Sequence, residues 1–194
     1  MPDSSARLRL HVLICSTRPG RVGEAVARWF HEQALTHGGF EAELVDLAAF
    51  NLPVFDEPHH PRQQQYVHEH TKRWSASVGA ADAFVFVTPE YNYGPPPSLL
   101  NALDYLVQEW AYKPVGFVSY GGISGGMRAV QMTKLTVTTL KMMPMLEAVA
   151  VPMVSQRVQG GPFQGDDTLA AAARTVLDEL LKWARAMKPM RAPG

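Results

Sequence analysis

The chain has 194 residues, a formal net charge of zero and 46% hydrophobic residues. This length and composition predict one globular domain over residues 1–194, and they exclude an intrinsically disordered chain. The balanced charge argues against a nucleic-acid partner, and no apolar run approaches the roughly 20 residues that span a bilayer. Because Cys15 is the only cysteine, no intrachain disulfide can form, and a cytoplasmic location without membrane contact is predicted.

Apolar segments alternate with helical patterns along the chain. Strands are predicted at 8–15, 41–47, 83–89, 114–120 and 147–154. Helices are predicted at 22–37, 65–81, 98–110, 125–143 and 166–188. Gly38 is expected to end the first helix, and Asp166 or Asp167 to cap the last. The Pro- and His-rich segment 48–65 is expected to be a long surface connection.

Five strands that alternate with five helices predict an α/β fold with helices on both faces of a parallel sheet. Right-handed crossovers leave few doubly wound strand orders, and order 2-1-3-4-5 suits a chain of this length. In that order, the loops after the first, third and fourth strands meet at one edge of the sheet. These three loops are therefore the candidate ligand site.

The first loop lies in CSTRPGRVGEAVARW, residues 15–29, between a strand and a helix. Ser16, Thr17, Arg18 and Arg21 surround a Pro-Gly turn at the expected helix start, where free amides and the helix dipole attract anions. Hydroxyl and guanidinium groups add charge-assisted bonds to a phosphate. The segment contains neither the GxxxxGK[ST] nor the GxGxxG pattern, so a nucleoside-triphosphate loop and a dinucleotide fingerprint are both excluded. An ordinary surface turn is the alternative.

The second loop lies in TPEYNYGPPPSLLNALDYL, residues 88–106. Three prolines stiffen the start of the following helix, so the loop has little freedom to lose when a ligand binds. Tyr91 and Tyr93 offer flat surfaces for a planar ligand. A rigid turn whose tyrosines merely cover apolar surface is the alternative.

The third loop lies in SYGGISGGMRA, residues 119–129, where four glycines allow the backbone to approach a ligand closely. A glycine-rich turn alone is weak evidence of a site. Taken together, however, the loops offer a phosphate site, an aromatic wall and backbone donors at one sheet edge. A phosphorylated planar ring system such as FMN satisfies all three.

The segments STRPGR, TPEYNYGPPPSLLNALDYL and SYGGISGGMRA resemble those of the NADPH-dependent FMN reductase family, which includes quinone, azo-dye and chromate reductases. The resemblance implies a flavodoxin-like domain that binds FMN, uses NADPH or NADH as the electron donor and forms a homodimer or homotetramer. By position, it implies a phosphate site, a wall for the ring and ribityl chain, and a backbone contact for the pyrimidine end. The residues implied are Ser16, Arg18, Arg21, Val22 and Gly23 for the phosphate, Pro89, Glu90, Tyr91, Asn92 and Tyr93 for the wall, and Tyr120, Gly121 and Gly122 for the pyrimidine end.

Two positions depart from the family pattern. Cys15 stands where the family often has glycine, and Glu24 stands where many members carry a hydroxyl or amide side chain in the first helical turn. Glu24 removes a possible phosphate ligand and brings a carboxylate close to the site. Arg18 and Arg21 are expected to compensate for that charge.

The expected reaction is hydride transfer from the nicotinamide donor to FMN, followed by electron transfer to a small acceptor, with no catalytic acid or base from the chain. Free flavin, a quinone, an azo compound or a metal oxyanion would fit as the acceptor. A flavodoxin-type electron-transfer module without its own nicotinamide activity is the alternative, although zero net charge argues against its usual acidic docking surface.

Other residues are assigned structural roles. No metal site is expected from His59, His60, His68 and His70, because no cysteine or clear carboxylate set accompanies them. Cys15 is expected to be a small buried residue. An apolar face on helix 98–110 is expected to extend beyond the core into a dimer contact together with the next helix. That face comprises Leu99, Leu103, Leu106, Val107 and Trp110.

Overall fold

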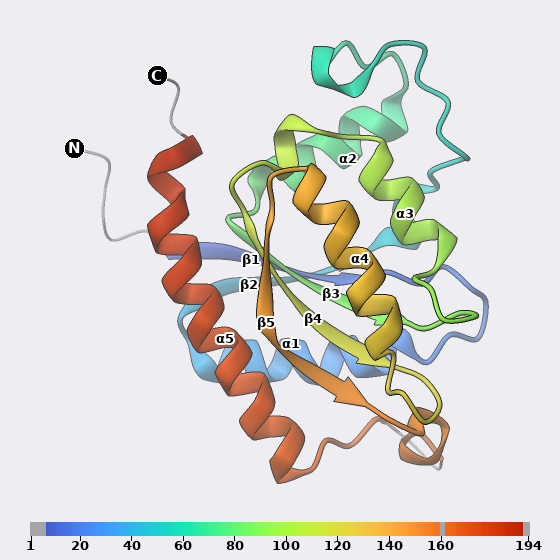
Figure 1. The fold of residues 1–194 in the computed structure, drawn as a ribbon, viewed down its shortest axis with the longest axis vertical. Helices are drawn as coiled ribbons and strands as arrows, with labels where there is room; N and C mark the ends of the chain where they lie inside the picture. The colour runs from blue at the N-terminus through green and yellow to red at the C-terminus, as the bar shows by residue number, and fades with distance from the viewer. Residues whose placement is uncertain (1–6, 160–161, 192–194) are drawn as a thin grey trace.

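The computed structural model describes residues 7–159 and 162–191. They contain one five-stranded sheet with helices on both faces (Figure 1). All its strands are parallel, and their order is β2-β1-β3-β4-β5, as the sequence predicts. The strands are β1 (Leu8–Ile14), β2 (Phe40–Asp46), β3 (Ala83–Pro89), β4 (Pro114–Tyr120) and β5 (Met143–Val151). The helices are α1 (Gly23–His37), α2 (Glu69–Ala80), α3 (Pro97–Asp104), α4 (Met127–Thr139) and α5 (Asp167–Met187).

The sheet lies between two helical layers. Helices α1 and α5 cover one face, and α2, α3 and α4 cover the other (Figure 1). Every residue of β3 and β4 is buried, which explains why these strands are apolar without alternation. The central strands therefore hold the loops at their carboxyl ends on a rigid base.

Both predicted helix signals are confirmed. Gly38 follows α1 with a φ of 70°, and its amide donates to the carbonyl of Ala34. The Asp166 carboxylate accepts a bond of 2.9 Å from the amide of Leu169 at the start of α5.

Several predicted helix boundaries are wrong. Helix α2 begins at Glu69 and not at residue 65. Helix α3 stops at Asp104 and does not continue to Trp110, because the chain bends to bury the indole of Trp110 against Trp74 and Phe84. Helix α4 spans Met127–Thr139 and is shorter than predicted at both ends. It cannot begin before Met127, because Gly126 has a φ of 84°, which is not a helical value.

Strand β5 also differs from its prediction. It spans Met143–Val151, so it begins four residues earlier than expected and ends three residues earlier. The start of β5 was not predicted because Pro144 lies there, and proline is rare inside a sheet. In this chain β5 is an edge strand, where a missing N–H is tolerated.

The apolar face predicted for a dimer contact lies inside the chain's own core. Four of its members are fully buried in the core between the sheet and helices α2 and α3: Leu99, Leu103, Leu106 and Trp110. That part of the prediction is wrong, because α3 itself buries Leu99 and Leu103, and the bend after α3 buries Leu106 and Trp110.

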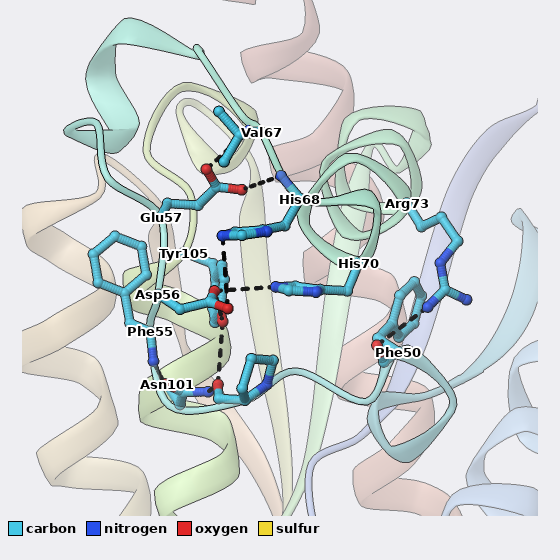
Figure 2. Close-up of polar contacts among 11 residues, drawn as sticks. Phe50, Phe55, Asp56, Glu57, Val67, His68, His70, Arg73, Asn101 and Tyr105 are labelled. Atoms are coloured by element: carbon cyan, nitrogen blue, oxygen red, sulfur yellow. Dashed lines mark hydrogen bonds and ion pairs between the residues drawn. The ribbon is translucent and has the colours of Figure 1, made fainter.

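The long connection after β2 contains two short 3₁₀ helices, η1 (Leu47–Phe50) and η2 (Pro61–Gln63). Figure 2 shows how it is held: the Asp56 carboxylate accepts bonds from His70 and Tyr105, at 3.1 and 2.8 Å. The Glu57 carboxylate accepts from the amides of Val67 and His68, at the start of α2. Within the described part of the chain, no helix is long and apolar enough to cross a membrane.

Candidate functional site

Strands β1, β3 and β4 are neighbours in the sheet, so the loops that follow them meet at one carboxyl edge. This is the switch point at which doubly wound folds bind ligands. The loops come from residues 15–22, 90–96 and 121–126, which include the three motifs singled out in the sequence.

The start of α1 has backbone amides that form no hydrogen bond within the described structure. Val22 precedes the helix without a side-chain cap, and the amides of Val22, Gly23 and Glu24 find no acceptor among the described residues. Gly20 turns the chain into the helix with a φ of 70°. Unpaired amides at the positive end of a 15-residue helix suit a phosphate.

The two arginines of this loop differ in their surroundings. Arg18 is exposed and has no side-chain partner within the described residues. Arg21 is mostly covered and forms an ion pair with Asp46, at the end of β2. The buried Nε of Arg21 has no hydrogen-bond partner in the described structure, so one of its donors is left for a ligand.

The Glu24 carboxylate is neutralised along its own helix. It accepts from Arg28, one turn later, at 2.7 Å, and this bond lowers the pKa of the Glu24 carboxyl. Arg28 on α1 is therefore the main compensating charge, and Arg21 adds a smaller favourable contribution.

Ser16 connects the first loop to the second. Its side chain is buried, and its hydroxyl lies 2.9 Å from the hydroxyl of Tyr91. Next to it, the Ser98 hydroxyl at the start of α3 donates to the carbonyl of Cys15 at 2.6 Å. These bonds fix the end of β1 against the loop after β3.

Residues 91–94 form a tight two-residue turn. The amide of Tyr91 donates to the carbonyl of Gly94, and the amide of Gly94 donates back, both at 2.9 Å. Asn92 and Tyr93 have φ values of 49° and 72°, a left-handed backbone that is costly for tyrosine. Tyr93 is 65% exposed, so its ring forms part of the surface at the edge of the site.

Arg128 holds this turn from the start of α4. Its amide donates to Glu90 at 3.1 Å, and its guanidinium binds the same carboxylate at 2.6 and 2.8 Å. The guanidinium also lies 3.9 Å from the centre of the Tyr93 ring. Although burial raises the pKa of the Glu90 carboxyl, the bonds from Arg128 outweigh it and the net pKa is lowered.

The Tyr120 side chain lies beneath the first loop, beside Gly23 and Ser16. Its ring is buried in the core beneath α1, where burial raises the pKa of its phenol, and its hydroxyl faces Gly23. A Cβ at Gly23 would lie 2.2 Å from that hydroxyl, so glycine is needed there for packing. The Tyr120 carbonyl accepts from the Glu90 amide at 3.2 Å. Tyr120 thus adjoins the loops both through its carbonyl and through its hydroxyl.

The two glycines after β4 are not equivalent. The Gly121 amide donates to the carbonyl of Val151, so it is already used within the fold. The Gly122 amide has no acceptor among residues 7–159 and 162–191. A Cβ at Gly122 would meet no atom within 4 Å, so open space lies beside its backbone.

Three residues that shape the site were not predicted from the sequence as site residues. Arg128 orders the second loop, Asp46 pairs with Arg21, and Ser98 anchors the end of β1. Arg128 lies near the end of the third motif. The position of Asp46 at the end of β2, next to β1, was a signal that could have identified it.

The remaining candidates have structural roles. Cys15 is fully buried, as predicted, and burial raises the pKa of its thiol. The rings of His68 and His70 stack 5.1 Å apart beside Asp56 (Figure 2). In the described ranges, no group of three or more His, Cys, Asp or Glu side chains is arranged to hold a metal ion.

Comparison with known proteins agrees with this geometry. Residues 8–156 match the NADPH-dependent FMN reductase family. The chain belongs to this family. It is a flavin-dependent oxidoreductase that uses NAD(P)H.

Two curated relatives span similar lengths. An NAD(P)H-dependent FMN reductase of Schizosaccharomyces pombe is 39% identical over 147 residues, which cover 74% of each chain. A quinone reductase of Pseudomonas putida is 31% identical over 137 residues, which cover 68% of this chain and 70% of the relative.

Solved structures share the fold. The flavoenzyme NAD(P)H:(acceptor) oxidoreductase FerB of Paracoccus denitrificans superposes with a TM-score of 0.73 at 18% identity, over 93% of this chain and 98% of the other. A flavodoxin from Streptococcus pneumonia TIGR4 gives a TM-score of 0.54 at 10% identity, over 90% and 98% of the two chains. The flavodoxin-like architecture predicted from the sequence is therefore confirmed.

The site of this FMN reductase fits its cofactor. The unpaired amides at the start of α1 and the buried free Nε of Arg21 suit a dianionic phosphate. The free Gly122 amide and the open space beside it suit the edge of a flat ring.

Proposed function

We propose that the 15–23 loop holds the phosphate of FMN and that the 89–94 turn and Gly122 border its ring. The observation that carries this proposal is the set of unpaired donors at the start of α1, because no described side chain satisfies them. In this arrangement Val22, Gly23 and Arg21 bind the phosphate, with exposed Arg18 closing over it.

The chain's residues bind and orient the cofactor, and the cofactor supplies the redox chemistry. Bound FMN would supply the redox chemistry, namely acceptance of a hydride from NADH or NADPH and transfer of electrons to a small acceptor. The rigid turn at 91–94 and its Arg128 support keep the wall in place before binding, which reduces the ordering cost. The unpaired Gly122 amide donates to an acceptor atom at the edge of the ring and stabilises negative charge there.

Small molecules such as quinones are the proposed acceptors, in line with the activity named for the Pseudomonas putida relative. The functional unit is proposed to be a homodimer or homotetramer. Exposed Met132 and Leu135 on the outer face of α4 support a contact between copies there, in place of the buried face of α3.

An anaerobic absorbance titration tests this function. The protein is loaded with FMN, freed of excess flavin, and mixed with NADPH and then with NADH. Retained flavin that bleaches within the time of mixing supports the reductase. Retained flavin that stays oxidised indicates the electron-transfer module instead, and a protein that neither retains FMN nor turns over free FMN contradicts the site.

A further inference from the structure

A second hollow lies beside the proposed phosphate site. It has a volume of about 640 Å³ and runs between α3, η1 and the chain that follows η1. Its apolar walls are Leu47, Leu52 and Leu100, and exposed Val54 and Thr17 of the first loop lie at its rim. This volume falls within the range of roughly 300–1,000 Å³ typical of small-molecule sites.

The outer wall of this pocket is held in place by α3. Both ends of the Asn101 side chain are used: its amide donates to the carbonyl of Pro53 at 2.6 Å, and its oxygen accepts from the Phe55 amide at 2.9 Å (Figure 2). The Tyr105 hydroxyl bridges Pro53 and Asp56, at 3.2 and 2.8 Å. The wall that carries Val54 is thus fixed by hydrogen bonds, and the pocket is preformed.

Few polar groups in the pocket are free to bind a ligand. Ser98 and Asn101 are occupied by bonds within the protein. Thr17, Asn51 and Asp104 have side chains that make no hydrogen bond to another described residue. Partial burial raises the pKa of the Asp104 carboxyl, and it forms no ion pair in the described structure.

The pocket lining contains no Lys, Arg or His. An anionic group would face the Asp104 carboxylate without a cation to offset the repulsion. A quinone offers only acceptor oxygens, which would also face that carboxylate. A flat apolar group that carries hydrogen-bond donors and places no negative charge beside Asp104 is the chemistry that fits.

We propose that this pocket binds the adenosine half of the nicotinamide donor and that Asp104 accepts hydrogen bonds from its ribose hydroxyls. The apolar walls contact the purine, and Asn51 and Thr17 bind its polar edge. Because Asp104 repels a 2′-phosphate, the pocket favours NADH over NADPH. The pocket adjoins the first loop at Thr17, so the donor's other half lies toward the proposed flavin.

Calorimetric titration of the FMN-loaded protein with 5′-AMP and with adenosine 2′,5′-bisphosphate tests the pocket without turnover. We expect 5′-AMP to bind at least about tenfold more tightly, a difference of about 1.4 kcal/mol. Asp104→Asn is expected to reduce this ratio to below about threefold, since it removes the repulsion and keeps the shape. Val54→Arg, at an 88% exposed position on the rim, is expected to reverse the preference.

Two matched variants control for general effects of charge. Asp167→Asn lies on exposed α5, across the sheet, and Val67→Arg lies outside the pocket on an exposed side chain. Both are expected to keep the wild-type ratio. The ratio of kcat/KM for NADH and NADPH should follow the same order among the variants.

Three results would overturn the proposal: equal or tighter binding of the bisphosphate by the wild-type protein, no binding of either nucleotide, or an unchanged ratio in both Asp104→Asn and Val54→Arg. The proposal rests on the nicotinamide-dependent function, but its failure is distinguishable. A protein whose flavin still bleaches with NADH or NADPH keeps that function, and only the pocket assignment is lost.

Discussion

The hydroxyl of Tyr120 lies where a side chain on Gly23 would begin, 2.2 Å from the position of its Cβ. The contact joins the end of β4 to the first turn of α1, so the start of the helix and the base of the site form one packed unit. Tyr120, which the resemblance implies as a cofactor contact, thus also has a packing role in this chain, and it helps to set where the amides at the start of α1 lie.

Gly23→Ala is therefore expected to displace the start of α1. We expect FMN affinity to fall at least about tenfold and the free energy of unfolding to fall by about 1–3 kcal/mol, as for other overpacked positions. Adding Tyr120→Phe removes the closest atom and should recover part of both losses. Gly79→Ala in α2, where a Cβ meets nothing, is the control and should be neutral or slightly stabilising. Full FMN affinity in Gly23→Ala would contradict this account.

Arg128→Lys is expected to loosen the 91–94 turn, because lysine cannot make the paired guanidinium bonds to Glu90 or stack flat on Tyr93. FMN affinity should fall by about 1–2 kcal/mol, in the range of a lost charge-assisted pair. The near-ultraviolet circular dichroism of Tyr93 should weaken at the same time. Arg185→Lys on α5 is the control; identical results for the two variants would exclude a positioning role for Arg128.

Gly122→Val separates ligand binding from folding. Its added atoms would enter open space, so the free energy of unfolding without FMN should change by less than about 0.5 kcal/mol. The same atoms would occupy the position proposed for the edge of the ring, so FMN affinity should fall. Fluorescence titration with FMN measures the loss, and unchanged affinity would remove Gly122 from the site.

Lys113 makes stability depend on pH. Its ammonium is buried against the carbonyls of Val78 and Gly79, and burial lowers its pKa to about 8. In the unfolded chain the group keeps a pKa of about 10.4, so the folded protein releases its proton first. Stability contributed by this group therefore rises with pH between about 8 and 10, by about 2 kcal/mol.

Urea unfolding at pH 7.5 and pH 9.5 measures this effect, with Lys113→Met as the comparison. The variant lacks the titrating group, so subtracting its pH dependence removes other contributions, including that of the buried thiol of Cys15. We expect the wild-type protein to gain relative to the variant as the pH rises. A relative loss would show that Lys113 is stabilised in its charged form.

The strand order and the meeting of the three loops could be predicted because they follow from local patterns. Alternating apolar strands and helices permit few right-handed parallel arrangements, and these place the loops after β1, β3 and β4 at one edge. The Gly38 and Asp166 helix ends were predictable for the same reason, since each depends on a few neighbouring residues.

By itself, the sequence determined the fold class, the three loops and the resemblance to flavin reductases, because these depend on periodicity and short motifs. The tertiary structure alone decided where α3 ends, that Arg21 pairs with Asp46 and that Tyr120 packs beneath Gly23. It also decided that Arg128 supports Glu90 and that a second pocket adjoins the first loop. These features depend on contacts between residues far apart in the chain, and local preference does not specify which distant side chains meet.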